Sequence, residues 1–507
     1  MHADALAAGD VIAAPARPLA ALPALLGAAS VQGELVGVWE RVQYDSRAVG
    51  PGDAFVAAKG LRSDGHAYVD QARERGAAVV VVETLARHVS IPQVVVANSR
   101  RALAVLAAEE AGHPSRELVM IGVTGTNGKT TTTHLLRAAL EAGGHRAGVI
   151  GTVGYSFGAE TESAPHTTPE APELQRTLRS WRDRGATAVA MEVSSHALSL
   201  ERTYGTAFDS GVFTNLTQDH LDFHETLESY RDAKARLFRA ETRGDRTKRF
   251  TSAINVDDTA GRWIREHADP PILGFGLDPG AEVTADDVRM DSAGTRLRIR
   301  TRHGSYPAAL RLRGQFNVQN ALAAFAGGLG AGLPPEAIVA GLEGVRSVPG
   351  RLEPVEAGQP YHVLVDYAHT PDALARALEA VRAMRPRRLL CVFGCGGDRD
   401  RGKRPLMGAA AVRGADLVFL TSDNPRSEDP AAILAAIEVG TVGASNVRRI
   451  VDRAEAIAAA VKECGDGDIL LIAGKGHETY QILGDRTIPF DDREVARRAI
   501  EARGLPR

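Results

Sequence analysis

A glycine-rich loop between an apolar strand and a helical pattern constrains the fold of this chain more than any other feature. The segment Gly122-Val-Thr-Gly-Thr-Asn-Gly-Lys-Thr-Thr131 follows the predicted strand Leu118–Val123 and precedes the predicted helix Thr132–Glu141. Glycines let backbone N–H groups close around phosphates, while Lys129 would neutralise the β- and γ-phosphates and Thr130 would place a hydroxyl on magnesium. The sequence therefore predicts an α/β domain that binds ATP and Mg²⁺.

The spacing of this loop departs from the general phosphate-loop pattern. Five residues separate Gly122 from Gly128, one more than the general pattern has. A glycine-rich structural turn is the alternative interpretation, and the strand and helix on either side favour a variant phosphate loop. The residues expected to contact ATP are Gly125, Thr126, Asn127, Gly128, Lys129, Thr130 and Thr131.

The chain is too long for a single hydrophobic core, and its 507 residues suggest about three domains. Short apolar runs alternate with helical stretches such as Arg101–Ala111, which indicates α/β structure throughout. We predict a small N-terminal α/β domain at residues 1–113, a central nucleotide-binding α/β domain at 114–346 and a C-terminal Rossmann-like α/β domain at 347–507. The segment Arg346–Gly350, which contains proline and glycine, is the predicted linker.

The composition argues against nucleic-acid and membrane partners. The formal net charge of −3 gives no basic surface. The longest apolar stretch, Pro18–Val31, contains Pro23, is too short to span a bilayer and predicts an amphipathic helix and turn. The first residues lack the positive charge of a secretion signal. We therefore expect a cytoplasmic protein, monomeric, with small-molecule substrates as its partners.

The cysteines indicate a reducing compartment and no metal site. Cys391 and Cys395 have a spacing compatible with a pair of metal ligands, but the chain has three cysteines and no second pair. We interpret them as packing and loop thiols.

Three strands of the predicted C-terminal domain are each followed by a polar loop marked by glycine or proline. In a doubly wound sheet, ligands bind beyond the carboxyl ends of the strands, so these loops should line one cleft. The predicted strands are Leu389–Phe393, Leu417–Leu420 and Ile469–Ile472, and their loops are Gly394–Lys403, Thr421–Arg426 and Gly474–Glu478.

Acidic and imidazole side chains follow two further strands of the central domain. The strand Ala188–Val193 contains Glu192 near its end, and a strand around Val212 leads into Asp219 and His220. Because magnesium prefers oxygen ligands, Glu192 with Thr130 is the expected first metal site, and His220 would join a second metal. A solvated helix start capped by Asp219 is the alternative for the second stretch.

Together these motifs resemble the Mur ligases of bacterial cell-wall synthesis, over nearly the whole chain. The segments that carry the resemblance are the phosphate loop, Met191–His196, Thr214–Asp222, Gly314–Asn320, Asp366–His369 and Lys475–Glu478. Near the N-terminus, Asp45-Ser-Arg47 with Gly52, Phe55 and Asp64–Gly65 looks like the nucleotide-sugar domain of the members that add the third amino acid. The resemblance implies an ATP-dependent ligase that joins meso-diaminopimelate to the D-glutamate of UDP-N-acetylmuramoyl-L-alanyl-D-glutamate through an acyl phosphate.

The resemblance also implies roles for individual residues. Ser46 would contact the UDP portion, and Thr167, Thr168, Ser194 and Arg202 would hold the muramoyl-dipeptide portion. Asn317 and Asn320 would lie at the adenine, and Arg351 and Asp366 would close over the nucleotide. Helix-start and turn chemistry is the alternative for each asparagine alone. Leu200 stands where family members often carry glutamine, so one polar substrate contact is in doubt.

Lys234 matches the lysine that is carbamylated in most of this family. A carbamate requires a neutral amine, hence a lysine whose pKa is lowered by burial or nearby cations, and the product would help to hold the second magnesium. Without the family, a solvated surface lysine is the alternative. The predicted catalytic residues are Lys129, Glu192, His220 and Lys234, and the predicted metal-binding residues are Thr130, Glu192, His220 and carbamylated Lys234.

The tetrapeptide Asp423-Asn-Pro-Arg426 is typical of relatives that add meso-diaminopimelate. Arg426 with Arg399 would grip the second carboxylate of this amino acid, and Asp423 with Glu478 would receive its distal ammonium. A tight turn after a strand is the alternative. The predicted diaminopimelate-binding residues are Arg399, Asp423, Asn424, Pro425, Arg426, Gly474 and Glu478.

Other functions remain open from the residues alone. The nearest is a related ligase for L-lysine or for a folate-linked glutamate tail. A phosphate-loop ATPase that works as a switch or motor belongs to a different class, as does a nucleotide-sugar-binding protein without catalysis.

Overall fold

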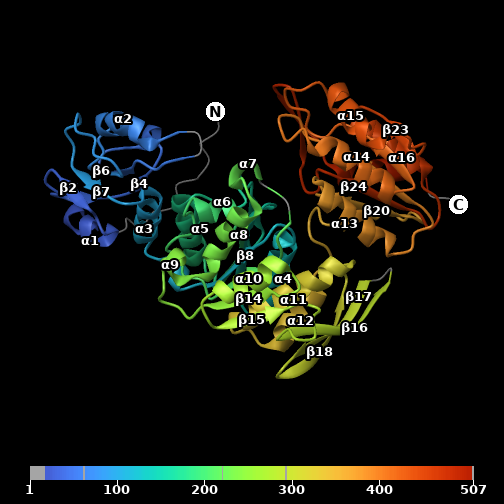
Figure 1. The fold of residues 1–507 in the computed structure, drawn as a ribbon, viewed down its shortest axis with the longest axis horizontal. Coiled ribbons are helices and arrows are strands. Elements are labelled where there is room, and N and C mark those ends of the chain that lie inside the picture. Colours follow the sequence, from blue (N-terminus) through green and yellow to red (C-terminus); the bar gives the residue numbers. More distant parts are fainter. Residues whose placement is uncertain (1–16, 61–62, 218, 220, 292–293, 505–507) are drawn as a thin grey trace.

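The chain folds into three α/β lobes, each built around its own sheet (Figure 1). The computed structural model describes residues 17–60, 63–217, 219, 221–291 and 294–504. The N-terminal and C-terminal lobes lie at opposite ends of the long axis, and the central lobe lies between them (Figure 1). This architecture confirms the predicted α/β fold class with three domains.

The N-terminal lobe contains a five-stranded sheet that is parallel except at one edge. In order across the sheet its strands are β2 (Ser30–Gln32), β7 (Gln93–Val95), β6 (Val79–Val82), β5 (Ala54–Val56) and β4 (Val42–Gln43); β1 (Arg17–Pro18) pairs with β3 (Val38–Trp39), and the helices are α1 (Leu22–Leu26), α2 (Val69–Glu74) and α3 (Ser99–Ala111). The helix and turn predicted within Pro18–Val31 are present as α1 and a turn at Gly27, whose φ is +57°.

The central lobe contains an eleven-stranded sheet with a parallel core. In order its strands are β11 (Glu160–Glu162), β10 (Gly154–Phe157), β9 (Ala147–Gly151), β12 (Ala188–Glu192), β8 (Val119–Thr124), β13 (Ser210–Phe213), β14 (Thr251–Asn255), β15 (Ile272–Phe275), β16 (Val283–Asp291), β17 (Gly294–Thr301) and β18 (Gly304–Leu310). Glu192 pairs in register with Val123, and Phe213 pairs with Thr124. The phosphate loop, Glu192 and the chain after β13 therefore meet at one edge of the sheet.

Helices cover both faces of this parallel core, as buried parallel strands require. One face packs against α4 (Lys129–Ala142), α11 (Gln315–Gly330) and α12 (Pro335–Gly344). The other face packs mainly against α5 (Ala171–Asp183), α8 (Leu227–Ala235) and α10 (Thr259–His267); the shorter helices of the lobe are α6 (Ser195–Ser199), α7 (Leu221–His224) and α9 (Ala240–Arg243).

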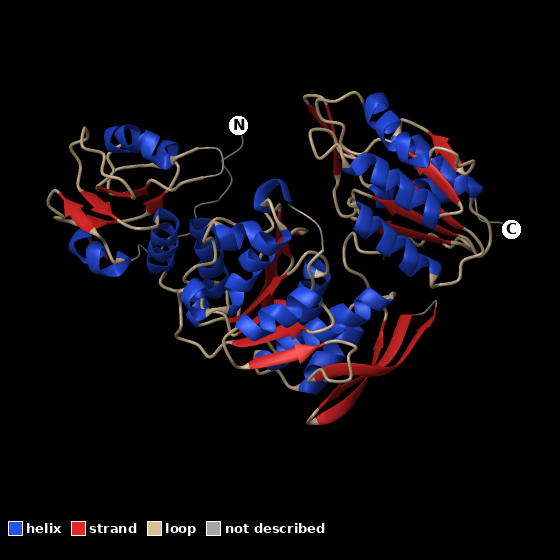
Figure 2. Cartoon of the chain, viewed as in Figure 1, coloured by secondary structure: helices blue, strands red, loops and turns tan. Residues whose placement is uncertain are grey.

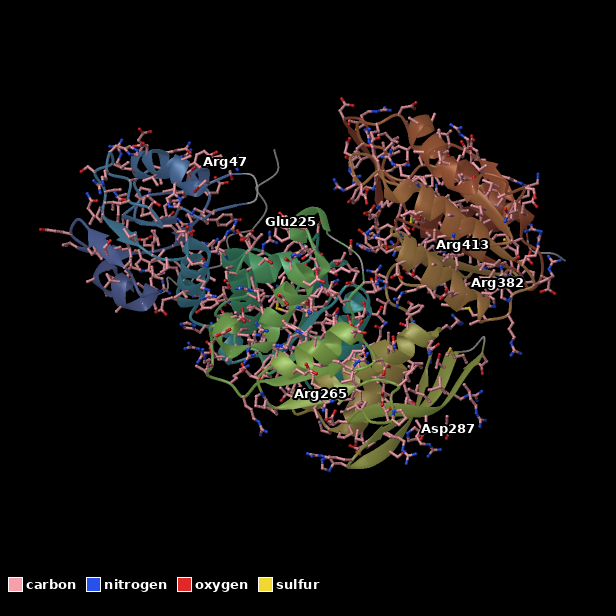
Figure 3. All side chains as sticks on the ribbon, viewed as in Figure 1. Arg47, Glu225, Arg265, Asp287, Arg382 and Arg413 are labelled. Atoms are coloured by element: carbon pink, nitrogen blue, oxygen red, sulfur yellow. The ribbon has the colours of Figure 1, made fainter. Side chains whose placement is uncertain are left out.

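Strands β16, β17 and β18 form an antiparallel extension that the sequence did not predict. It projects from the central lobe (Figure 2). Along β17, buried Leu297 and Ile299 alternate with exposed arginines, and Arg298 pairs with Asp287 at 3.3 Å. Asp287 lies on the outer part of this extension (Figure 3). This alternation is typical of a strand with one solvated face. The many charged residues on that face hid the strand pattern in the sequence.

The C-terminal lobe contains a six-stranded sheet that is parallel apart from one edge strand. In order its strands are β19 (Glu353–Pro354), β20 (His362–Asp366), β24 (Ile469–Ala473), β21 (Leu389–Phe393), β22 (Leu417–Leu420) and β23 (Val447–Arg449). Helices α13 (Pro371–Arg382), α14 (Lys403–Gly414) and α15 (Pro430–Glu438) cover one face, and α16 (Arg453–Glu463) and α17 (Asp492–Arg503) cover the other; β25 (Tyr480–Leu483) and β26 (Arg486–Pro489) form a separate hairpin. The three predicted strands are present, two with the predicted bounds.

A buried ion pair holds two strand ends of this lobe at a fixed spacing. Arg453 and Asp492 are both fully buried, and the guanidinium donates to the two carboxylate oxygens at 2.7 Å each. Arg453 also donates to the carbonyl oxygens of Ser422, at 3.2 Å, and of Ala473, at 3.0 Å. It therefore ties the loop that follows β22 to the end of β24.

Among the described residues, no helix is both long enough and apolar enough to cross a membrane.

We predict that Asp492→Ala lowers the free energy of unfolding by about 3–5 kcal/mol, because it leaves the Arg453 charge buried without its partner. Chemical denaturation followed by circular dichroism measures the change. Glu463→Ala is the control, since it removes the partner of Arg448 in an exposed pair of the same lobe and should cost less than about 1 kcal/mol. Equal losses in the two variants would contradict the prediction.

Candidate active site

The phosphate loop is held in shape by the residues that follow β13. Thr214 Oγ1 donates to the carbonyl oxygen of Asn127 at 2.6 Å, and Asn127 N donates to Asn215 Oδ1 at 3.0 Å. Thr126 N donates to the carbonyl oxygen of Asn215 at 2.8 Å. The first N–H groups of α4, which have no acceptor within the helix, are then the groups available to phosphate oxygens.

Two glycines of the loop are required by both conformation and space. Gly125 and Gly128 have φ values of +147° and +86°, in the region that favours glycine. A Cβ atom on Gly125 would collide with Thr214 Oγ1, and one on Gly128 would collide with Asn320 Oδ1. The backbone of the loop therefore lies directly against α11 and against the chain that follows β13.

Two lysines donate to the same carbonyl oxygen of this loop. Lys129 Nζ lies 2.9 Å from Gly125 O and 2.8 Å from Thr126 O, and Lys234 Nζ lies 2.8 Å from Gly125 O. Burial lowers the pKa of Lys129. Burial, followed by the nearby charge of Lys129, holds the pKa of Lys234 well below its ordinary value. Lys234 is thus a buried amine in surroundings that favour its neutral form, not a solvated surface charge.

Glu192 is a buried carboxylate fixed on several sides. Thr130 Oγ1 and Thr152 N each donate to Glu192 Oε1 at 2.9 Å, and Thr152 Oγ1 donates to Oε2 at 3.1 Å. Thr152 follows β9 at the same sheet edge, and the sequence analysis did not single it out. The rule that ligands gather at carboxyl ends of parallel strands was a signal that pointed to it.

The oxygen atoms around Thr130 are suitable ligands for a hard divalent cation. The Thr130 hydroxyl and the Glu192 carboxylate offer oxygen ligands side by side, which magnesium prefers. In the described part of the chain, no group of three or more His, Cys, Asp or Glu side chains could hold a metal ion. His220, the predicted second-metal ligand, lies outside the described residues. Cys391 and Cys395 are buried, and burial raises the pKa of each thiol to about 12.

The residues predicted to hold the muramoyl-dipeptide lie beside Glu192. Thr167 Oγ1 is 3.1 Å from Thr152 Oγ1, and Thr168 Oγ1 accepts from Ser194 N at 3.0 Å. Arg202 donates to the carbonyl oxygen of Thr168 at 3.0 Å. The structure thus gathers these predicted residues next to the predicted metal site.

Glu170 links this group to the N-terminal lobe, and the sequence analysis did not single it out. Its two carboxylate oxygens pair with Arg202, at 2.9 Å, and with Arg100 of α3, at 2.8 Å. Ser46, predicted to contact UDP, lies in the N-terminal lobe, where its hydroxyl donates to Gln71. It does not line the central cavity described below.

The C-terminal lobe reaches into the phosphate loop. Arg351 Nη2 donates to Thr130 Oγ1 at 3.0 Å, and Asn127 Nδ2 lies 3.4 Å from Asp372 Oδ2. Asp366 accepts from the backbone N–H groups of Leu352 and Ala368, and burial raises the pKa of its carboxyl group. The two lobes are therefore in contact at the place predicted for the nucleotide.

A cavity of about 310 Å³ lies between the central and C-terminal lobes. The central lobe contributes Gly128, Lys129, Thr130, Thr167, Glu192, Ser194, Lys234 and Asn320 among others, and the C-terminal lobe contributes Arg351, Asp366, Tyr367 and His369 among others. Asn320 Nδ2 donates to Asn317 Oδ1 at 3.0 Å, so both predicted adenine-edge asparagines are buried on α11 beside the loop. Most of the predicted ATP-binding residues therefore surround one cavity.

The three polar loops of the C-terminal lobe also meet. Gly397 N donates to the carbonyl oxygen of Asn424 at 2.9 Å, and Asn424 Nδ2 donates to Glu478 Oε2 at 2.9 Å. Arg426 donates to the carbonyl oxygen of Gly397 at 2.7 Å. A Cβ atom on Gly396 would lie within 4 Å of both Arg426 and Arg399, so the two arginines flank one position.

The hairpin β25–β26 holds the tetrapeptide loop. Arg426 has a φ of +52°, and its backbone N and O bond to Ile482 O at 3.1 Å and Gly484 N at 2.8 Å. Gln481 Nε2 donates to the carbonyl oxygen of Asp423 at 2.7 Å. No motif in the sequence predicted a role for this hairpin.

The two arginines of the predicted amino-acid site lie near the nucleotide cavity but outside it. Of the described residues, neither Arg399 nor Arg426 lines the 310 Å³ cavity. Tyr367 lines it and packs against Gly476; burial and then the charge of Glu478 raise the pKa of its phenol to about 12. Tyr367 therefore lies between the cavity and the three loops.

These features define a class of protein: a three-domain α/β protein with a phosphate-binding loop on its central sheet and a second polar site at the edge of its third sheet. Residues 39–118 match the family model "Mur ligase family, catalytic domain", residues 123–328 match "Mur ligase middle domain", and residues 350–476 match "Mur ligase, glutamate ligase domain". The chain belongs to the Mur ligase family, which confirms the predicted resemblance.

Individual relatives agree with this assignment. The UDP-N-acetylmuramoyl-L-alanyl-D-glutamate--2,6-diaminopimelate ligase of Geobacillus thermodenitrificans (strain NG80-2) is 47% identical over 464 residues, which cover 91% of this chain and 95% of that protein. A solved structure of a protein with the same name has a TM-score of 0.71 at 33% identity and covers 97% of this chain and 100% of its own. The MurF ligase from Thermotoga maritima in complex with ADP shares the fold, with a TM-score of 0.59 at 20% identity over 92% of this chain and 98% of its own.

We predict that Gly128→Ala weakens ATP binding about tenfold or more, because a side chain there is strained and meets Asn320. Calorimetric titration with ATP measures the dissociation constant. Gly344→Ala is the matched control, since a Cβ atom at Gly344 meets no atom within 4 Å. ATP binding by Gly128→Ala at wild-type strength would contradict the packing argument.

Proposed function

We propose that this protein joins meso-diaminopimelate to the D-glutamyl γ-carboxylate of UDP-N-acetylmuramoyl-L-alanyl-D-glutamate, with cleavage of ATP to ADP and phosphate. The reaction is a step of peptidoglycan precursor synthesis. The names of its 47% and 33% identical relatives support the substrates. The observation that carries the proposal is the cavity in which Lys129, Thr130 and Glu192 face Arg351 and Tyr367 from the third lobe.

In the first step, a γ-carboxylate oxygen attacks the γ-phosphorus of ATP and ADP leaves. The N–H groups at the start of α4 and the Lys129 ammonium would bind the β- and γ-phosphates, and Arg351 would add a second cation from the opposite lobe. To do so, Lys129 would leave its present acceptors, the carbonyl oxygens of Gly125 and Thr126, and Arg351 would leave Thr130 Oγ1. Thr167, Ser194 and Arg202 would orient the dipeptide beside them.

Magnesium bound at Thr130 and Glu192 would screen the charge of the transferring phosphoryl group. Thr152 holds the Glu192 carboxylate in place for this role. Lys234 would be carbamylated, because its surroundings favour the neutral amine that carbamylation requires.

In the second step, the amine of meso-diaminopimelate attacks the acyl carbon, phosphate leaves and the amine loses a proton, which completes the amide. Arg399 and Arg426 would pair with the distal carboxylate, and Asp423 and Glu478 would accept from the distal ammonium. L-Lysine lacks that carboxylate and would leave the guanidinium groups unpaired, so it is the weaker substrate. Closure about Arg346–Gly350 would bring the amine to the acyl phosphate past Tyr367.

The proposal includes a cytoplasmic location and a monomeric state. Gel filtration with light scattering measures the oligomeric state.

A competition experiment tests the function directly. Purified protein is incubated with ATP, Mg²⁺, the UDP-dipeptide and an equimolar mixture of meso-diaminopimelate, L-lysine and L-glutamate, and the nucleotide products are weighed by mass spectrometry. We expect the meso-diaminopimelate tripeptide to dominate. A lysine product, or ATP hydrolysis that is independent of both acceptors, would overturn the proposal in favour of the related ligase or of an ATPase.

We predict that Arg426→Ala raises the KM for meso-diaminopimelate about a hundredfold and changes the KM for ATP less than about twofold, because the distal carboxylate loses its cation. Steady-state phosphate release measures both constants. Arg413→Ala is the control, since Arg413 lies on the surface at the end of α14 (Figure 3). Equal changes in both KM values would remove Arg426 from amino-acid recognition.

We predict that Lys234→Ala loses most activity and regains part of it with added short carboxylic acids, which would supply the carboxylate that the carbamate provides. Initial rates with and without acetate or propionate measure the rescue. Lys462→Ala, at an exposed lysine, should show neither effect. Full activity of Lys234→Ala without added acid would exclude the carbamate.

A further inference from the structure

Lys475 is a buried charged residue for which the proposed reaction has no role. It lies in the loop after β24, and its side chain is 0% exposed. Its Nζ donates to Glu478 Oε2 at 3.1 Å and to Asn424 Oδ1 at 3.3 Å. A buried ammonium requires such partners, and here both belong to the predicted amino-acid site.

The three side chains close a triangle of hydrogen bonds. Asn424 Nδ2 donates to Glu478 Oε2 at 2.9 Å, and Asn424 Oδ1 accepts from the backbone N–H of Ile482 at 3.0 Å. Every hydrogen bond that described residues give to the Glu478 carboxylate ends on Oε2. Oε1 is therefore left for a ligand, and the side chain is 17% exposed, so a ligand can reach it.

Lys475 itself has no access to a ligand, because its side chain is fully buried and its Nζ lies 5.5 Å from the ring centroid of Tyr480. Its ammonium can therefore act on a ligand only through the groups it contacts, Glu478 and Asn424.

We propose that Lys475 is a positioning residue for amino-acid recognition: with Asn424 it fixes Oε2 of Glu478, so that Oε1 is presented to the distal ammonium of a diamino acid. The inference rests on the proposed function, in which Glu478 accepts from that ammonium.

Steady-state kinetics of the full-length enzyme test the inference. Lys475→Met keeps the volume of the side chain and removes the charge, and it should raise the KM for meso-diaminopimelate about tenfold or more. The KM values for ATP and the UDP-dipeptide should change less than about twofold. Lys462→Met applies the same substitution to an exposed lysine of the same lobe and should leave all three KM values unchanged. A loss of kcat or stability without a selective rise in the KM for diaminopimelate would overturn the inference.

A double-mutant cycle separates positioning from a structural role. Glu478→Gln alone should raise the KM for meso-diaminopimelate, and adding Lys475→Met to it should change that KM less than about twofold, because Lys475 acts through Glu478. If the effects of the two substitutions on this KM multiply in the double variant, the inference is wrong. If Lys475→Met does not fold, Lys475→Arg carries the test: it keeps the charge but moves the donors, so a selective rise in the same KM is expected, and an unchanged KM overturns the inference.

The wild-type enzyme separates this inference from the proposed function. If it makes no tripeptide from meso-diaminopimelate, the proposed function fails, and the inference fails with it. If it makes the tripeptide while the Lys475 variants keep the wild-type KM, only the inference fails.

Discussion

One backbone carbonyl organises the central site, because Gly125 O accepts from both Lys129 and Lys234. Two ammonium groups on one buried acceptor would repel each other, and burial together with the charge of Lys129 favours the neutral amine of Lys234. A bound triphosphate would stabilise the charge of Lys129, and reaction of the neutral Lys234 amine with carbon dioxide would create a carboxylate beside it. Thr214 packs against Gly125 and leaves no room for a side chain at this position.

The third lobe completes the site through a small number of polar contacts. Arg351 meets Thr130, whose hydroxyl also donates to Glu192, so one threonine links the phosphate loop, the central sheet and the third lobe. The interface between these lobes surrounds the cavity and also includes apolar packing, because Phe316 of α11 packs against the core of the third lobe. Interfaces between domains of one chain commonly allow the domains to move relative to one another.

The sequence predicted the strand ends and their loops well, since apolar runs followed by glycine or proline identify them without knowledge of strand order. The rule that ligand-binding loops follow the carboxyl ends of parallel strands placed Glu192, Thr130 and the phosphate loop at one sheet edge, and they lie there in the structure. It missed Thr152 and Glu170, because isolated threonine and glutamate residues carry no local pattern. The separation of Arg399 and Arg426 from the cavity depends on how two lobes are oriented, and periodicity holds no information about that. The domain boundaries and individual binding roles stay predictions.

The hairpin β25–β26 gives the backbone of Arg426 its two hydrogen bonds and a conformation that side chains rarely adopt. The conformation of Arg426 therefore depends on two stretches of chain that are far apart in sequence. The same tetrapeptide without the hairpin would lose both of these backbone hydrogen bonds. Substitutions in the hairpin would act on the arginine through its backbone, and a comparison of side chains in the tetrapeptide alone would not detect them.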